Sequence, residues 1–229
     1  MKRSHRIALL AFELALIVIF SLLPINLGAA SLALTLLPVL VIAMTQDFKT
    51  ALLGGLIMGV TSLIGAFTVG AGSLTAPLFR NPLVSVLPRL FVPAVAWAVD
   101  RGIVALYTKS QVRKAAERAK RAGDGEKAED GEKSEEGKIV SETEVRAMPK
   151  PWRAATDALA SALGVMANTA LVLGMIWLFY GGKTVGDSAI NAEFMAGLVS
   201  VNFVIEVIVM TVLTPPIAFA IRKQQEKKG

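Results

Sequence analysis

The chain has 229 residues and a formal net charge of +6, with one histidine and no cysteine. It is 54% hydrophobic with a mean hydropathy of +0.57, and its apolar residues gather into runs near 20 residues. These values predict an all-α polytopic membrane protein and argue against a soluble domain. The absence of cysteine excludes disulfides and thiolate chemistry. The basic residues cluster beside the apolar runs, as membrane topology requires, so we expect no nucleic-acid binding.

Six apolar segments along the chain predict a bundle of six transmembrane helices in one membrane domain, 1–229. We expect these helices at about 7–23, 29–44, 51–71, 83–107, 154–180 and 192–221. The second segment is short for a bilayer and contains Pro38. We therefore expect it to be irregular or covered by its neighbours.

Lysine and arginine are distributed unevenly over the two sides that these helices define. One side has only Arg80 and Lys183, and the other side has both termini and most of the basic residues. The positive-inside rule therefore predicts that both termini are cytoplasmic and that Arg80 lies outside.

A charged linker at about 109–151 separates the fourth and fifth helices. Its first part, 111–122, is rich in Ala, Lys and Arg and can extend the fourth helix into water. Asp124-Gly-Glu-Lys then recurs at Asp130-Gly-Glu-Lys, without aromatic or aliphatic residues between the repeats that could anchor a fold. Such a sequence predicts a disordered cytoplasmic connector.

The start of the fourth helix carries the strongest indication of a binding site. Asn81 is a typical N-cap residue, and Pro82 suits the first helical turn. Arg89 follows seven residues later, where a guanidinium costs about 2.5–3.5 kcal/mol at the bilayer centre. A helix N-terminus also favours negative charge. Arg80, Asn81 and Arg89 therefore predict a site for an anion that faces outward.

Polar side chains in the last two helices extend this candidate site. Asn168 lies within the fifth segment, and Asn202 and Glu206 lie four residues apart on one face of the sixth. Polar groups in such segments tend to face an interior cavity, although buried amides often only bridge helices. Glu206 could also serve as the charge partner of Arg89. Trp177 is either an anchor at the membrane interface or a residue that lines the entrance of the pocket.

Two stretches of small residues predict close helix packing. Ala11-x-x-x-Ala15 on the first helix is a candidate docking face for another protein, whereas Gly55-x-x-x-Gly59 on the third favours packing within the chain. Glu13 lies between the two alanines. It could be a functional carboxylate, or it could reach the cytoplasmic interface.

An enzyme is not expected from this sequence. Gly182-Lys183-Thr184 resembles the end of a phosphate-binding loop, but Trp177 stands where the first glycine of that motif is required. The one histidine, His5, lies in the polar N-terminal tail, and the helices offer only isolated acids. We therefore expect no catalytic residue, no metal site and no cofactor.

Three features of this chain resemble the S component of an energy-coupling factor (ECF) vitamin transporter. They are the six apolar segments in fewer than 230 residues, the Ala11-x-x-x-Ala15 face, and the stretch from Phe79 to Arg89. The resemblance implies a substrate-binding subunit of a bacterial cell membrane that has no ATPase activity. It implies docking through Ala11 and Ala15 onto a transmembrane coupling subunit, which two ATPases drive. The vitamin would then bind near the outer face, between loops and the last three helices.

The arginines favour a carboxylate or a phosphate, and the asparagines suit hydroxyl and amide groups. Pantothenate fits these groups best, and folate or a corrinoid such as cobalamin are further possible substrates.

The alternative function is a self-sufficient proton-coupled transporter of a small anion, with Glu13 or Glu206 as proton carrier. A membrane scaffold without a substrate is a third hypothesis. We find no similarity between the two halves of the chain of the kind that inverted repeats produce.

Overall fold

The computed structural model describes residues 3–22, 25–27, 30–32, 34–126, 148–186, 188–199 and 202–227. Within these ranges, nothing is described of the side chains of residues 3–6, 22, 25–27, 30–32, 118–126, 202 and 227. Helices make up most of this part of the chain, and the strands in it form two short antiparallel hairpins. The elements are α1 (Arg3–Leu22), β1 (Ile25–Leu27), β2 (Ala30–Leu32), α2 (Leu36–Thr45), α3 (Phe48–Phe67), α4 (Ala76–Phe79), α5 (Pro82–Ser85), α6 (Leu87–Glu126), α7 (Lys150–Tyr180), β3 (Thr184–Val185), β4 (Ser188–Ala189), α8 (Ala192–Val199) and α9 (Asn202–Lys227).

The apolar helices confirm an all-α polytopic membrane protein. Among the described residues, four stretches are long and apolar enough to cross a membrane, namely Phe48–Phe67, Pro82–Glu117, Lys150–Tyr180 and Ala192–Glu226, the last of which includes two residues outside the description. Two shorter apolar helices, Ile7–Ser21 and Leu36–Thr45, accompany them. Nearly all of α2 is buried, from Pro38 to Met44, so the short second helix is covered by its neighbours as expected.

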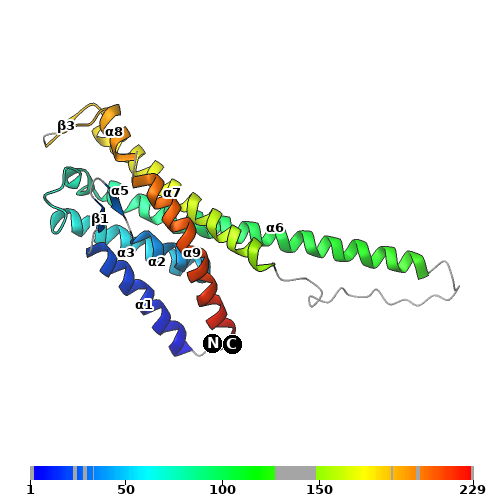
Figure 1. The fold of residues 1–229 in the computed structure, drawn as a ribbon. Coiled ribbons are helices and arrows are strands. Elements are labelled where there is room, and N and C mark those ends of the chain that lie inside the picture. The colour runs from blue at the N-terminus through cyan, green and yellow to red at the C-terminus, as the bar shows by residue number, and fades with distance from the viewer. Residues whose placement is uncertain are drawn as a thin grey trace. The chain divides into compact units, whose positions relative to one another are not determined.

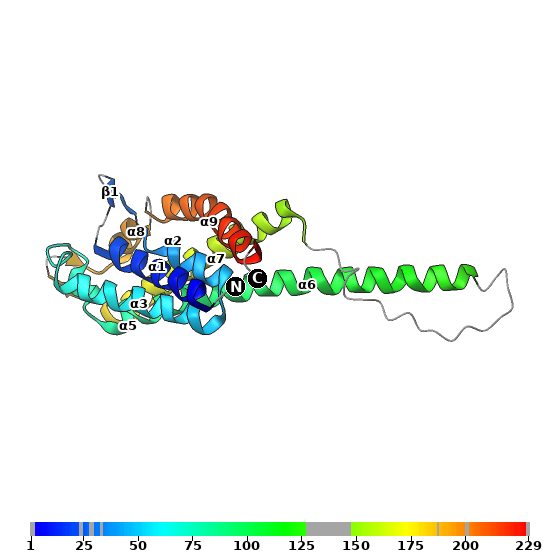
Figure 2. The same cartoon turned by 90° about the horizontal axis from the view of Figure 1, so that it is seen from below.

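The chain divides into two compact units, of which the first comprises 1–100 and 154–229 and the second comprises 101–153. Figures 1 and 2 show both termini at one end of the first unit and β1, α5 and α8 at the opposite end. One apolar core joins α1, α2, α3, α6, α7 and α9. A second core lies at the end away from the termini, around Leu78, Val84, Ile176 and Ile190.

The second predicted helix, 29–44, is wrong in its first part. Ala30–Leu32 is a strand that pairs with Ile25–Leu27, and the helix begins only at Leu36. A helix from residue 29 would place Pro38 in its interior, where the ring clashes with the preceding turn and removes a hydrogen bond. Because α2 begins at Leu36, Pro38 falls in the first turn, where no helical partner for its missing N–H is required.

The fourth predicted helix, 83–107, is also divided in the structure. Asn81 is an N-cap as predicted, since its side chain accepts a hydrogen bond from the N–H of Leu83 at 3.0 Å. The helix that it caps is the single turn α5, and α6 begins afresh at Leu87, which puts Pro88 in the first turn. The N-terminus of the long helix is therefore not the one that Asn81 caps.

The charged linker is described only in part. Helix α6 continues to Glu126, which confirms that the alanine-rich and basic start of the linker extends the fourth helix. Arg113 and Glu117 pair across one turn of this extension, with Nε and Oε1 2.9 Å apart and both side chains exposed. The first repeat, on which the prediction of a disordered connector rests in part, begins in this helix with Asp124-Gly-Glu, so the predicted connector does not begin at Asp124. The rest of the repeats lies in residues 127–147, outside the described residues.

The glycine motif on α3 packs within the chain, as predicted. A Cβ added to Gly55 would lie 2.5 Å from the carbonyl oxygen of Arg89 and 2.8 Å from the ring of Pro93. A Cβ at Gly59 would lie 2.8 Å from the Cα of Val86. The two glycines therefore let the backbone of α3 approach the α5–α6 segment, which fixes the position of Arg89.

We expect Gly55→Ala to destabilise the protein, because the new methyl group meets backbone that cannot move aside without shifting α6. Overpacking of this kind costs about 1–3 kcal/mol. Thermal unfolding of the purified protein measures the loss. Gly65→Ala is the matched control on the same helix, since a Cβ there meets nothing within 4 Å. Equal melting temperatures for the two variants would contradict the close approach at Gly55.

Candidate functional site

Arg89 is the centre of the candidate site. Its side chain is buried, with 8% of the residue surface exposed. The guanidinium Nη1 donates a hydrogen bond to the carbonyl oxygen of Val84 at 2.8 Å. In an uninterrupted helix that carbonyl would accept from the N–H of residue 88, but Pro88 has none. The proline thus frees a backbone acceptor, and this acceptor holds the guanidinium.

Phe79 forms the second contact of Arg89. The guanidinium carbon lies 4.9 Å from the centre of the Phe79 ring, a cation–π distance. Phe79 is the last residue of α4, and its carbonyl oxygen accepts a hydrogen bond from the hydroxyl of Ser85. The stretch from Phe79 to Arg89 therefore folds back on itself and orients both the ring and the cation.

One cavity beside Arg89, which we call the α7–α9 cavity, has a volume of about 260 Å³. The residues around it include Phe79, Arg89, Asn168, Thr169, Ile176 and Glu206. The side-chain oxygen of Asn168 is buried without a hydrogen-bond partner among the described residues. The structure thus brings together three of the predicted site residues, Arg89, Asn168 and Glu206, and combines a cation, an acid and an amide in one small space.

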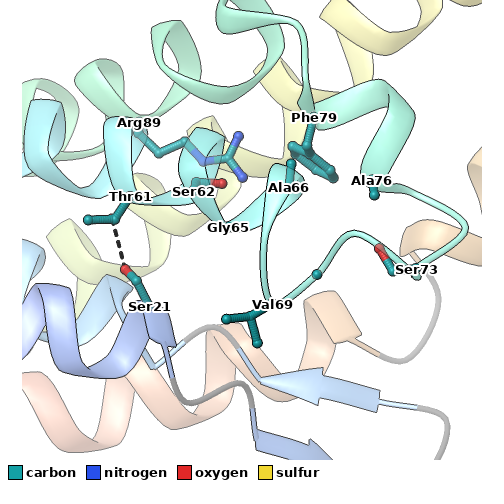
Figure 3. Close-up of a pocket in the computed structure, with 11 residues that line it drawn as sticks. Ser21, Thr61, Ser62, Gly65, Ala66, Val69, Ser73, Ala76, Phe79 and Arg89 are labelled. Carbon is teal, nitrogen blue, oxygen red and sulfur yellow. Dashed lines mark hydrogen bonds between the residues drawn. The ribbon is translucent and has the colours of Figure 1, made fainter.

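A second cavity, which we call the α1–α3 cavity, lies beside Arg89 as well and has a volume of about 200 Å³ (Figure 3). Its polar lining comes from the hydroxyls of Ser21, Thr61, Ser62 and Ser73 together with Arg89. Phe79 also lines both cavities. Arg89 and Phe79 therefore form the boundary between a hydroxyl-rich space and a space that holds Glu206.

The other predicted site residues lie elsewhere or are not described. Arg80 is exposed, donates from Nε to the carbonyl oxygen of Ala66 at 3.3 Å, and lies with its Cζ 5.4 Å from the Phe67 ring centre. Trp177 is 53% exposed, and Asn81 caps α5. None of these three lines either cavity. The side chain of Asn202 is outside the described part of the chain.

The two sides of α1 differ in burial. Ala11 and Ala15, the predicted docking residues, are exposed. Glu13 is 3% exposed and lies beside the side chain of Gln46. Its carboxylate therefore faces the interior of the helix bundle instead of the cytoplasmic interface, while the alanine face is left free on the surface of the first unit.

A buried ionic cluster near the end of α9 was not predicted. Arg222 forms two hydrogen bonds with the carboxylate of Asp157, at 2.7 and 2.8 Å, and donates to the carbonyl oxygen of Met44 at 3.1 Å. Asp100 lies 4.0 Å from the same guanidinium. The cluster ties α9 to α2, α6 and α7. Acidic residues within two apolar segments were the available signal, because a buried acid requires a cationic partner.

The fold and the site together define a class of protein. A bundle of apolar helices with small, partly polar cavities around a buried cation suits a membrane protein that handles a small molecule. Among the described residues no cluster of His, Asp and Glu could hold a metal ion.

The comparison with protein families agrees with this class. The model of the family "ECF transporter, substrate-specific component" matches residues 5–218, so the chain belongs to that family. The resemblance inferred from the alanine face and the Phe79–Arg89 stretch is thereby confirmed. The family consists of substrate-binding components of transporters and is not an enzyme family. No curated protein matches the sequence.

Proposed function

We propose that this chain is the high-affinity binding subunit for an anionic, water-soluble vitamin in an ECF-type importer of a bacterial cell membrane. The convergence of Arg89, Asn168 and Glu206 on one cavity is the observation that carries the proposal. The cavity adjoins the apolar core at the end of the first unit away from the termini. With the termini in the cytoplasm, as the positive-inside rule predicts, that end faces outward.

Pantothenate is the substrate that these groups favour. It carries one carboxylate for Arg89 and hydroxyl and amide groups for Asn168 and Glu206. Drug-sized ligands fill cavities of about 300–1,000 Å³. The two cavities beside Arg89, of about 200 and 260 Å³, are both small on this scale, which supports a compact vitamin over folate and more strongly over cobalamin.

The partners in this proposal are a transmembrane coupling subunit and two ATPase subunits. The exposed Ala11 and Ala15 support docking through α1. Small side chains on an exposed helix face allow the backbone of another helix to approach closely in lipid.

Binding to the purified protein in detergent tests the proposal. A thermal-shift screen against a vitamin panel, followed by titration calorimetry, is expected to show tight one-to-one binding of pantothenate without a proton gradient. Reconstituted vesicles are expected to take up the vitamin only when the coupling subunits and ATP are present. Uptake by the isolated chain in response to a proton gradient would instead support the secondary transporter with Glu13 or Glu206 as proton carrier.

A further inference from the structure

The two cavities beside Arg89 differ in charge. The α7–α9 cavity contains the carboxylate of Glu206 together with the guanidinium. Around the α1–α3 cavity, Arg89 is accompanied by hydroxyl-bearing, small and apolar residues, without an acid among its lining residues. A substrate carboxylate in the α7–α9 cavity would have an acidic residue as its neighbour, whereas among the described residues around the α1–α3 cavity it would have the cation and no acid. The charge distribution thus separates a space for an anion from a space for uncharged polar groups.

The hydroxyl groups of the α1–α3 cavity have different capacities for hydrogen bonding. The hydroxyls of Ser21 and Thr61 lie 2.9 Å apart, and each is also within 2.8 Å of a carbonyl oxygen of its own helix. Their two protons are therefore engaged within the protein. Ser62 makes no side-chain hydrogen bond within the described part of the chain, so its proton is available to a ligand. Figure 3 shows Ser62 and Arg89 at the same cavity.

We propose that the anionic group of the substrate binds in the α1–α3 cavity, against Arg89 and Ser62, and that its uncharged hydroxyl- or amide-bearing end lies in the α7–α9 cavity with Asn168 and Glu206. This inference rests on the proposed function and assigns the two ends of that substrate to separate spaces. A carboxylate or a phosphate satisfies the chemistry, because both accept hydrogen bonds from a guanidinium and a hydroxyl. Arg89 and Phe79 line both spaces, so in this proposal the two ends of the substrate lie on either side of this pair.

Gly65 offers a way to fill the anion space alone. It lines the α1–α3 cavity, and a Cβ added there meets nothing within 4 Å. The Cβ of a larger residue therefore fits at this position without meeting other atoms, and we expect the γ-methyl groups of valine to reduce the space that Gly65 lines. Gly174 is the matched control, because it is also a helical glycine whose added Cβ meets nothing within 4 Å, and it lines neither cavity.

The test compares the affinities of pantothenate and of its neutral analogue, in which an alcohol replaces the carboxylate. Titrations use the unaltered protein, Gly65→Val, Ser62→Ala, Glu206→Gln and Gly174→Val. We expect the preference for the carboxylate over the alcohol to fall by about tenfold or more in Gly65→Val and by roughly threefold or more in Ser62→Ala. Gly174→Val is expected to keep the preference. Glu206→Gln is expected to weaken both ligands similarly and so to keep the preference as well.

Two results would separate the failure of this inference from the failure of the proposed function. If Gly65→Val and Ser62→Ala keep the preference while Glu206→Gln changes it, the anion lies in the α7–α9 cavity, and the inference is overturned although the vitamin still binds. If the unaltered protein binds no pantothenate, the proposed substrate is wrong, and the inference is overturned with it. A melting temperature for each variant shows whether it is folded.

Discussion

Arg89→Ala is expected to weaken the binding of pantothenate by roughly 10- to 150-fold. Loss of a hydrogen bond to a charged group costs about 1.5–3 kcal/mol, and each 1.4 kcal/mol is about tenfold in affinity. The guanidinium is buried at the boundary of two cavities, so water cannot replace it easily. Titration calorimetry on the purified protein measures the change, and the neutral alcohol analogue should lose much less affinity.

Arg80→Ala is the matched control for this variant. Arg80 is a neighbouring arginine that is exposed and lines neither cavity, so its loss should leave the affinity within about twofold of the original value.

Pro88→Ala changes the backbone contact of Arg89 without removing the charge. It restores an N–H that can pair with the Val84 carbonyl, and this competes with the hydrogen bond from Arg89.

These variants together test whether Arg89 contributes to vitamin binding and whether it must be held by Val84 to do so. Unchanged affinity in folded Arg89→Ala protein would remove this residue from the site. If the guanidinium must be held by Val84 for binding, Pro88→Ala should weaken binding in the parent protein but have little further effect in the Arg89→Ala background. Such non-additivity is the sign of two residues that act through one contact.

The parts of the fold that depend on local sequence could be predicted. The polar cap at Asn81 and the exposed alanines on α1 follow from residue type and helical spacing, and the Gly55–Gly59 face follows from the need for close packing in lipid. The starts of α2 and α6 were misplaced, although Pro38 and Pro88 carry the signal. A proline within an apolar run is compatible with a helix that begins close before it, but it does not fix that start, because Pro93 lies inside α6 and Pro215 and Pro216 lie inside α9.

The parts of the site that depend on tertiary contacts could not be predicted. Ser21 and Thr61 are 40 residues apart in sequence, and only the packing of α1 on α3 brings their hydroxyls within 2.9 Å. Asp157 and Arg222 are 65 residues apart, and their ion pair likewise requires the folded bundle. The sequence indicated that Arg89, Asn168 and Glu206 face a common interior. It did not indicate that Arg89 faces two cavities of different charge.

Replacing both Ala11 and Ala15 by leucine is expected to abolish vitamin uptake and to leave vitamin binding unchanged. Both alanines are exposed on α1, while Glu13 and Ile17, on the other side of the helix, are buried. The larger side chains therefore project away from the core and from both cavities. They hold a partner helix away from the backbone of α1, which removes the close packing that small residues allow. Titration with pantothenate, co-purification with the coupling subunit and vesicle uptake are the three measurements.

Ala170→Leu is the control for added bulk on an exposed face of a membrane helix. Ala170 is an exposed alanine of α7 and lines neither cavity, so this variant should bind, assemble and transport normally. Assembly and uptake that persist in the Ala11→Leu, Ala15→Leu protein would show that the coupling subunit docks elsewhere. Loss of vitamin binding in that protein would show instead that the exposed alanine face of α1 contributes to the vitamin site. Because Arg89→Ala should do the reverse, sparing assembly and losing binding, the two variants together test whether docking and binding use separate surfaces.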